Sequence, residues 1–195
     1  MKPFFKIDDN SKECRPRNTV GMTLNAENLT LVKFTAEMLS QEYIDWLNDR
    51  EIMQYSNQQF LDHTRRSCLD YIASFDQVDD FLWGIFVDDD FQKCVGSIST
   101  HINRTHNTAD VGIFVGDSGV RGTGVGTKAW IAVCEFLLKE CDVRKVCGGA
   151  LATNRSMIKI FKKAGMQKDG RRVQHHLCNG EAVDLLHYCL FQKGE

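Results

Sequence analysis

A run of glycines is the first feature of this sequence that suggests chemistry. Six of the fifteen glycines lie between Gly112 and Gly126, and the segment Arg121-Gly-Thr-Gly-Val-Gly separates an apolar alternating run from a helical apolar pattern. A strand that passes into a helix through such a turn leaves the first main-chain amides of the helix without partners. Glycines let a ligand approach those amides closely, and the positive end of the helix dipole attracts anions. The pattern therefore predicts a site for a phosphate or a diphosphate.

The spacing of these glycines differs from that of two common nucleotide-binding loops. A dinucleotide-binding turn has the spacing G-x-G-x-x-G in a parallel unit, whereas this segment has G-x-G-x-G after a predicted antiparallel meander. Lys128 is out of register for the loop of nucleoside-triphosphate-binding proteins. A tight turn without a ligand is the alternative interpretation, because glycines also serve turns and close packing.

Three side chains close to this turn in sequence could transfer protons. Asp110 belongs to a strand predicted over residues 109–115, and His101 and His106 flank the hairpin before it. Histidine suits proton transfer near neutral pH, and a carboxylate can act through a water molecule. The alternatives are an exposed strand acid and two polar hairpin residues.

Length and composition favour one globular domain. The chain has 195 residues, of which 43% are hydrophobic and 26% charged. Residues 1–26 show no sustained period and are predicted to be a tail or irregular lead-in, which leaves residues 27–195 as the domain. The net charge of -2, with no long stretch of one sign, argues against a nucleic-acid partner. No apolar stretch approaches the roughly 20 residues needed to cross a bilayer, so no membrane partner is expected.

The eight cysteines show neither a C-x-x-C pair nor the Cys/His spacing of a metal site. We interpret them as reduced thiols in a cytoplasmic protein and predict no metal site.

Hydrophobic periodicity predicts a mixed α/β fold of the α+β kind, with a mostly antiparallel, twisted sheet and helices that cover it. About seven strands are expected at residues 29–34, 81–87, 94–102, 109–115, 144–152, 171–177 and 183–191. About four helices are expected at residues 35–47, 63–75, 127–140 and 155–164. Gly148 and Gly149 weaken the strand at 144–152, which suits either the close approach of a ligand or a packing need.

Two motifs at the expected separation resemble the GNAT superfamily of acyl-CoA-dependent N-acetyltransferases. Arg121-Gly-Thr-Gly-Val-Gly matches its [Arg/Gln]-x-x-Gly-x-[Gly/Ala] signature, and the segment from Asn154 to Met166 resembles its later Asn-initiated helix. The resemblance covers about residues 27–192. Together with Tyr43-Ile-Asp-Trp-Leu-Asn-Asp, the layout is similar to the branch that contains ribosomal-protein N-terminal, spermidine and nucleotide-amino-sugar acetyltransferases.

This resemblance implies acetyl-CoA as the acetyl donor and a GNAT fold. The turn amides would bind the diphosphate, and the pantetheine arm would lie between two splayed strands. An amide near Phe114 or Val115 would polarise the thioester carbonyl, and the acceptor amine would attack directly in a ternary complex. The donor-binding residues that the resemblance implies are Ile113, Phe114, Val115, Arg121, Gly122, Thr123, Gly124, Val125, Gly126, Thr127 and Asn154.

The sequence departs from the family where many relatives carry a proton donor for the departing thiolate. Phe161 stands where they have a tyrosine, and Met157 stands where some have a serine. Ser156 is one position away, so Asp110, His101 and Ser156 are the catalytic candidates; a water, His175 or Tyr188 could replace Ser156 as the acid. A non-catalytic CoA-binding regulatory module is the alternative function.

The acceptor is expected to be a primary amine, either a small molecule such as a nucleotide-linked amino sugar or a protein N-terminus. A homodimer is a further expected partner, although the sequence itself does not give the oligomeric state. The candidate acceptor contacts are Trp46, Tyr55, Phe60, Trp83 and His175.

Overall fold

The computed structural model describes residues 23–25, 28–87 and 93–192, and in them it places one eight-stranded sheet with helices on both faces. The strands lie in the order β1-β2-β3-β4-β5-β6-β8-β7, and every neighbouring pair is antiparallel except β5 and β6. The strands are β1 (Thr23–Asn25), β2 (Leu29–Lys33), β3 (Asp80–Val87), β4 (Cys94–Asn103), β5 (Thr108–Val115), β6 (Lys145–Leu151), β7 (Gln167–Cys178) and β8 (Glu181–Phe191). The α-helices are α1 (Gln41–Asn48), α2 (Arg65–Ala73), α3 (Val125–Lys139) and α4 (Arg155–Lys163), and the short 3-10 turns are η1 (Ala36–Met38), η2 (Asn57–Phe60) and η3 (Ser118–Val120). The expected α+β class with a mostly antiparallel sheet is confirmed.

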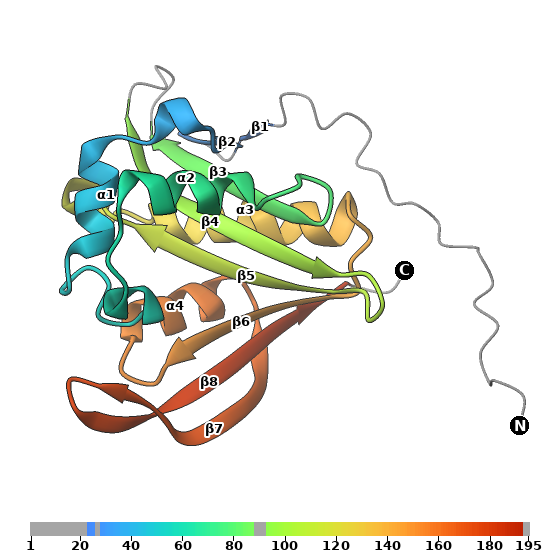
Figure 1. The fold of residues 1–195 in the computed structure, drawn as a ribbon. Helices are drawn as coiled ribbons and strands as arrows, with labels where there is room; N and C mark the ends of the chain where they lie inside the picture. The colour runs from blue at the N-terminus through green and yellow to red at the C-terminus, as the bar shows by residue number, and fades with distance from the viewer. Residues whose placement is uncertain (1–22, 26–27, 88–92, 193–195) are drawn as a thin grey trace, which may run out of the picture.

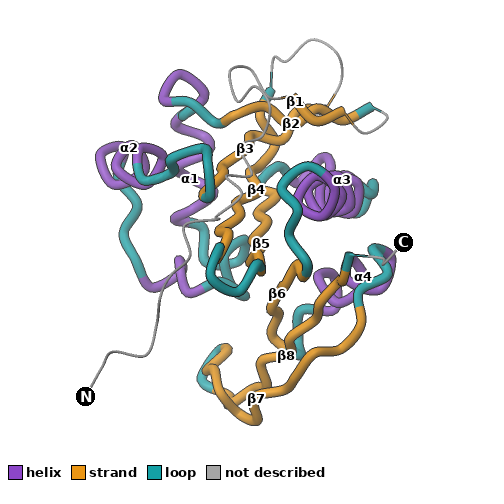
Figure 2. Tube along the Cα trace, turned by 90° about the vertical axis from the view of Figure 1, so that its right-hand side faces the viewer, coloured by secondary structure: helices purple, strands orange, loops and turns teal. Residues whose placement is uncertain are grey.

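The helices form two layers on opposite sides of the sheet. Helices α1 and α2 lie on one side of the central strands, and α3 and α4 lie on the other (Figures 1 and 2). Successive side chains of a strand point to opposite faces, so residues opposite one another in the register share a face. Ala109 and Val111 of β5 therefore point toward α3, and Asp110 points toward the side of α1 and α2.

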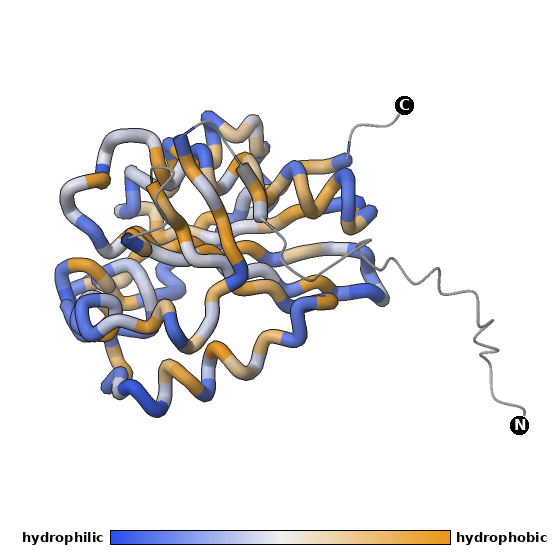
Figure 3. Tube along the Cα trace, turned by 90° about the horizontal axis from the view of Figure 1, so that it is seen from above, coloured by the Kyte–Doolittle hydropathy of each residue, from blue (hydrophilic) through white to orange (hydrophobic). Residues whose placement is uncertain are grey.

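The larger core lies between the sheet and α3. Trp83 of β3 is fully buried there, stacks on Phe81, and meets Phe136 of α3 edge-on at 5.7 Å. A smaller core under α1 and α2 contains Phe34, Tyr43 and other apolar residues. Apolar segments accordingly follow the central strands, while the turns are mostly hydrophilic (Figure 3). Burial on both faces explains why β3 is an almost continuous apolar run rather than an alternating one.

Three segments differ most from the expected elements. The helix expected at 35–47 is interrupted, because Ser40 adopts an extended conformation and its side chain accepts a hydrogen bond from the Tyr43 amide to begin α1. Thr23–Asn25, which fall in the expected irregular lead-in, form β1 and pair with β2. Residues 1–22 of that lead-in lie outside the described residues. Strand β7 begins four residues before the expected strand at 171–177, since bulges interrupt its pairing with β8 and break the alternating pattern.

In the described part of the chain, no helix combines the length and apolar character needed to cross a membrane. The same residues contain no group of three His, Cys, Asp or Glu side chains placed to hold a metal ion.

Candidate functional site

Strands β5 and β6 separate partway along their length. Their parallel pairing consists of Thr108 with Lys145, Ala109 with Val146 and Asp110 with Cys147, and it ends there. Both strands continue, β5 to Val115 and β6 to Leu151, and Figure 1 shows them diverging toward their C-terminal ends. We call the region between residues 111–115 and 148–151 the splay.

Main-chain groups of both strands face the splay. The Gly116 amide donates to Val95 O at 3.0 Å, which places even-numbered residues of β5 toward β4 and odd-numbered residues toward β6. The amides of Ile113 and Val115 therefore point into the splay, whereas the Phe114 amide points to β4. On the other side, the Ala152 amide donates to Asp184 O at 2.9 Å, so by the same alternation Gly149 and Leu151 face the splay. Two diverging edges with unpaired donors and acceptors suit an extended ligand that carries amides of its own.

The glycine turn lies at the C-terminal end of β5 and opens α3. Gly122 has φ +80° and Gly124 has φ +100°, and a Cβ at either position would meet no atom within 4 Å. Gly124 is the N-cap of α3 and supplies no capping side chain. Among the described residues, no acceptor contacts the main-chain amides of Gly122, Gly124, Val125, Gly126 and Thr127. The first turn of α3 thus presents several unpaired amides beside open space, which is the geometry of an anion site.

Two side chains of the turn hydrogen-bond to main-chain carbonyl oxygens and do not contact these amides. Arg121 folds back onto the end of β5, where its guanidinium donates to Val115 O at 3.2 Å and to Gly116 O at 2.9 Å. Thr123 Oγ1 donates to Val120 O at 2.7 Å. Both side chains therefore bind carbonyl oxygens, and Arg121 braces the turn against β5.

Helix α4 borders the same region. Asn154 is its N-cap, and its Oδ1 accepts from the Met157 amide at 3.0 Å, so capping explains this residue locally. Ser156 is exposed on the first turn of α4. Phe161 is fully buried and stacks on Tyr188 of β8 with ring centroids 4.8 Å apart. The position that carries a tyrosine in many relatives is thus part of the core here.

The two glycines of β6 have different surroundings. A Cβ at Gly148 would lie 2.8 Å from Phe161 and 2.9 Å from Trp130, so packing beneath these rings explains Gly148. Gly149 is exposed on the opposite face, and the nearest atom to a Cβ there is 3.7 Å away. Of the two explanations left open by the sequence, close packing accounts for Gly148, whereas a Cβ at Gly149 would make only ordinary van der Waals contacts.

Polar side chains gather on the sheet face opposite α3, next to the splay. His101 of β4 pairs in register with Asp110 of β5, and both are exposed. His101 Nδ1 lies 2.8 Å from Asp80 Oδ1, and the ring lies against Phe75, with centroids 5.4 Å apart. The hydroxyl of Tyr71 interacts with Ser99 on the same face; burial raises the pKa of Tyr71, and this hydrogen bond opposes that shift.

Two half-buried thiols, Cys147 and Cys94, lie on this side of the sheet. Cys147 of β6 lies opposite Asp110 and is half-buried, and its pKa is raised first by burial and then by the charge of Asp110. Cys94 is also free, and burial raises its pKa. Raised thiol pKa values disfavour the thiolate, so neither cysteine has the character of an activated nucleophile.

The five expected acceptor contacts separate into three groups. Trp46 of α1 covers the end of β5, where a Cβ at Gly116 would lie 2.1 Å from its ring. Tyr55 and Phe60 are exposed in the segment between α1 and α2, and His175 is exposed on β7. The first segment meets the β7–β8 hairpin where Cys178 Sγ lies 3.9 Å from Gln54 O. Trp83 does not belong with them, because it is fully buried under α3 on the other face of the sheet.

The sequence interpretation missed Asp80, Phe75, Tyr71 and Ser99. Asp80 and Ser99 lie on strands adjacent to one another, and their relation to Asp110 depends on register, which the sequence did not give. Phe75 and Tyr71 follow the helical pattern of α2, which indicated only a buried face. Because the sequence gives no register, it offered no signal that aligns residues 80, 101 and 110.

Comparisons with known proteins agree with this geometry. The family model described as "Acetyltransferase (GNAT) domain" matches residues 28–167. A probable N-acetyltransferase of Bacillus subtilis (strain 168), YjcK, is 22% identical over 144 residues, covering 73% of this chain and 78% of the relative.

Solved structures share the fold at low sequence identity. A GNAT-family acetyltransferase from Bacillus anthracis has a TM-score of 0.75 and 17% identity, and the match covers 89% of this chain and 100% of that one. Spermidine N-acetyltransferase from Vibrio cholerae, in complex with CoA and spermine, has a TM-score of 0.73 and 16% identity, with 85% and 96% covered. Because the family model spans well over half of the sequence, and the splay and open turn lie where the motifs predict them, this chain belongs to the GNAT acetyltransferase family.

Proposed function

We propose that this protein transfers the acetyl group of acetyl-CoA to a primary amine by direct attack in a ternary complex. The observation that carries the proposal is the alignment of two unpaired sets of main-chain groups. The unpaired amides of Gly122 and of Gly124 to Thr127 lie at the C-terminal end of β5, and the free edges of β5 and β6 begin at the same end. One extended thioester carrier can engage both sets at once.

Different residues of the chain bind different parts of acetyl-CoA. The first-turn amides of α3 bind the diphosphate, which is also favoured by the helix dipole. The edge groups of Ile113 and Val115 on β5 and of Gly149 on β6 pair with the amides of the pantetheine arm. The Val115 or Ile113 amide polarises the thioester carbonyl, since the Phe114 amide points to β4 instead.

Asn154 and Ser156 border the carrier from α4. Asn154 Oδ1 is occupied by the Met157 amide, which leaves its amide nitrogen available to the ligand. The exposed Ser156 hydroxyl is the candidate to protonate the departing thiolate, because Phe161 carries no proton to give. The acceptor approaches from the other face of the sheet, between Trp46 and the β7–β8 hairpin.

The acceptor class is a small amine, such as a nucleotide-linked amino sugar, or the N-terminus of a protein. Family members with closely similar folds use different amines; one solved neighbour is a spermidine N-acetyltransferase. The open face beside Asp110 has few bulky side chains, since Gly112 and Gly149 are both exposed there. This favours acceptors whose amine projects from a larger body.

Release of the CoA thiol tests the proposal. Purified protein is mixed with acetyl-CoA and, in separate reactions, with a polyamine, a nucleotide-linked amino sugar, a free amino acid and peptides with free or blocked N-termini. Thiol release that depends on a free primary amine supports the proposal. Tight acetyl-CoA binding without thiol release for any amine would instead favour a non-catalytic binding module.

A further inference from the structure

A line of ionisable side chains crosses the sheet where the splay begins. In the register, Asp80 of β3 lies opposite His101 of β4, His101 lies opposite Asp110 of β5, and Asp110 lies opposite Cys147 of β6. Directly paired residues project to the same face, so these four side chains share the face opposite α3. The pairing of β5 with β6 ends at this line.

His101 is held in one orientation by its neighbours. Its Nδ1 contacts Asp80 Oδ1 at 2.8 Å, and Phe75 lies against the ring at a 30° angle. A carboxylate at Nδ1 favours the tautomer with the proton on Nδ1, which leaves the lone pair on Nε2. Among the described residues, nothing bonds to Nε2.

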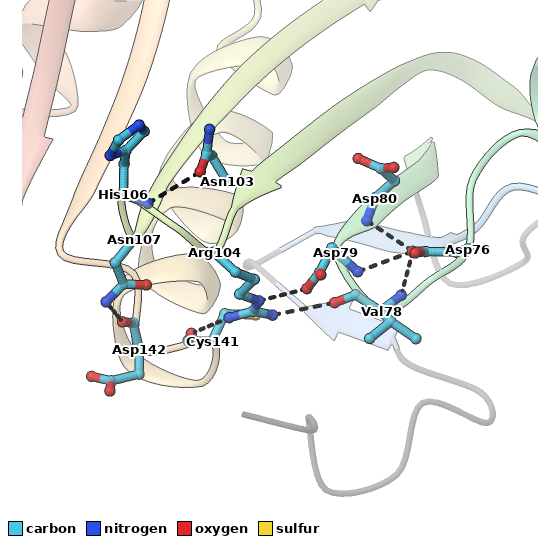
Figure 4. A network of polar contacts seen from close by, with 10 residues as sticks. All are labelled: Asp76, Val78, Asp79, Asp80, Asn103, Arg104, His106, Asn107, Cys141 and Asp142. Carbon is cyan, nitrogen blue, oxygen red and sulfur yellow. Dashed lines mark hydrogen bonds and ion pairs between the residues drawn. The ribbon is translucent and has the colours of Figure 1, made fainter. Parts of the chain in front are cut away.

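The backbone of Asp80 is held in position by the carboxylate of Asp76. The Asp76 carboxylate accepts hydrogen bonds from the amides of Val78 at 2.8 Å, Asp79 at 3.0 Å and Asp80 at 2.9 Å (Figure 4). These bonds set the position at which β3 begins. The Asp80 carboxylate therefore reaches His101 from a braced backbone.

Asp110 lies beside His101 with its carboxylate free. It is exposed and makes no hydrogen bond or ion pair with any other residue that the structure describes. The alternation of β4–β5 hydrogen bonds makes His101 and Asp110 a hydrogen-bonded pair, for which the Cα separation is about 5.5 Å. The next residues on this face, Gly112 and Gly149, have no side chains, so a substrate can enter from the splay side.

We propose that Asp110 and His101 form an ammonium subsite for the acceptor, in which Asp110 binds the cation and His101 Nε2 removes its proton. Asp80 and Phe75 are the positioning residues of His101. The inference rests on the proposed acetyl transfer and names its acceptor class: a primary amine that arrives as a cation. A carboxylate with no other partner is a strong acceptor for ammonium N–H groups, whereas an imidazole is the better proton acceptor near neutral pH.

The step balances within these residues and the two substrates. One ammonium N–H bond breaks, and its proton moves to His101 Nε2. The nitrogen lone pair then forms the N–C bond to the acetyl carbonyl, the C–S bond breaks, and its electron pair leaves with sulfur. A second N–H bond of the same nitrogen then breaks, its proton is taken up by the thiolate, and His101 returns the first proton to solvent.

The charged surroundings of His101 are few. Asp80 faces it from β3, Asp110 from β5, and Cys147 lies beyond Asp110 on β6. The Tyr71 hydroxyl of α2 engages Ser99. Arg104 pairs with Asp79 and with Cys141 O at the end of α3, so its charge is already compensated there (Figure 4).

The test compares His101→Gln with His106→Gln in the full chain, using the best amine of the thiol-release panel. His106 is a matched control, because it is an exposed histidine on the turn between β4 and β5 and belongs to none of the pairs that form the line. We expect His101→Gln to lower kcat/KM for the amine at neutral pH by about 10²–10⁴-fold, the usual contribution of a general base. His106→Gln should match the wild type, and the Kd of acetyl-CoA should be the same in all three proteins.

The pH profile separates proton removal from a structural role. Without the base, His101→Gln needs the amine to arrive unprotonated, so its kcat/KM should rise about tenfold per pH unit below the amine pKa.

Asp80→Asn should lower kcat by about tenfold and Asp80→Glu should restore part of it, whereas Asp110→Asn should mainly raise KM for the amine. Wild-type kcat/KM and pH profile in His101→Gln would overturn the inference. A wild type that acetylates no amine would overturn the proposed function and this inference together, and no variant is needed to see it.

Discussion

Substitution of Gly124 tests the placement of the diphosphate at the α3 turn. Gly124 has φ +100°, and a Cβ there would meet no protein atom within 4 Å. The protein therefore has steric room for a side chain at this position, and only the backbone conformation and the ligand require glycine. Gly124→Val adds a branched side chain to the turn that carries the unpaired amides.

The expected losses have different sizes for stability and for binding. A non-glycine residue in the left-handed region costs about 1–2 kcal/mol, and this strain appears as lower stability whether or not a ligand binds. Each charge-assisted hydrogen bond to the diphosphate that the side chain blocks is worth about 1.5–3 kcal/mol. One blocked bond therefore raises the Kd of acetyl-CoA roughly tenfold to 150-fold.

Gly180 provides a matched control. It has φ +83° in the turn between β7 and β8, and a Cβ there also meets nothing within 4 Å. Gly180→Val should share the loss of stability and keep the acetyl-CoA affinity. Gly124→Asn adds a further comparison, because asparagine tolerates the left-handed region better and still adds a side chain to this turn.

The assay combines calorimetric titration of acetyl-CoA with thermal unfolding of each variant. Loss of affinity in both Gly124 variants, with retained affinity in Gly180→Val, is the expected pattern. A folded Gly124→Val protein that binds acetyl-CoA with the wild-type Kd would refute the placement of the diphosphate on these amides.

Three further predictions concern packing and ionisation. Gly148→Ala should lower the free energy of unfolding by about 1–3 kcal/mol through overpacking, whereas Gly149→Ala should leave it nearly unchanged. Denaturant titration of both variants measures the difference, and equal effects would contradict the packing explanation. Desolvation raises the pKa of Asp76, but three backbone hydrogen bonds outweigh it and hold this pKa below its usual range. The ionised carboxylate therefore stabilises the fold at any pH above the unfolded-state pKa. This stabilisation is lost as the pH falls through the folded-state pKa. Asp76→Asn should therefore cost about 1 kcal/mol near neutral pH, a value reduced for its exposure, and the difference from the wild type should vanish in acid. Burial raises the pKa of Cys134 to about 12, so at pH 8 only about one thiol in 10⁴ is ionised. Alkylation of the folded protein should therefore leave Cys134 unmodified. Rapid labelling of this residue, detected by peptide mass mapping, would contradict its burial.

The fold, the glycine turn and the Asn154 cap were accessible from the sequence because their signals are local. Glycine spacing, an apolar strand before the turn and a capping Asn154 each act over a few residues, and the structure places them as expected. The strand at 171–177 was harder to bound, since the bulges of β7 depend on its pairing with β8.

The acceptor side was less accessible because it depends on register and on which face a side chain occupies. Trp83 and Trp46 look equivalent in sequence, as aromatic residues in apolar surroundings. In the structure, Trp83 points toward α3 and is buried, whereas Trp46 covers the end of β5. A shift of one residue along a strand exchanges these faces, and no local pattern in β3 reports it, since that strand is buried on both sides.

The dependence on strand register also explains why the sequence around Asp80 does not suggest its contact with His101. Asp80 follows two other acids, Asp76 and Asp79, in what looks like a solvated turn. Asp76 binds three amides and Asp79 pairs with Arg104, so both are occupied in holding the turn. Only Asp80 has entered β3, where the register sets it opposite His101. A turn that serves the fold thus places one carboxylate on the face where we propose that the acceptor binds, and the strength of the His101 contact depends on where β3 begins.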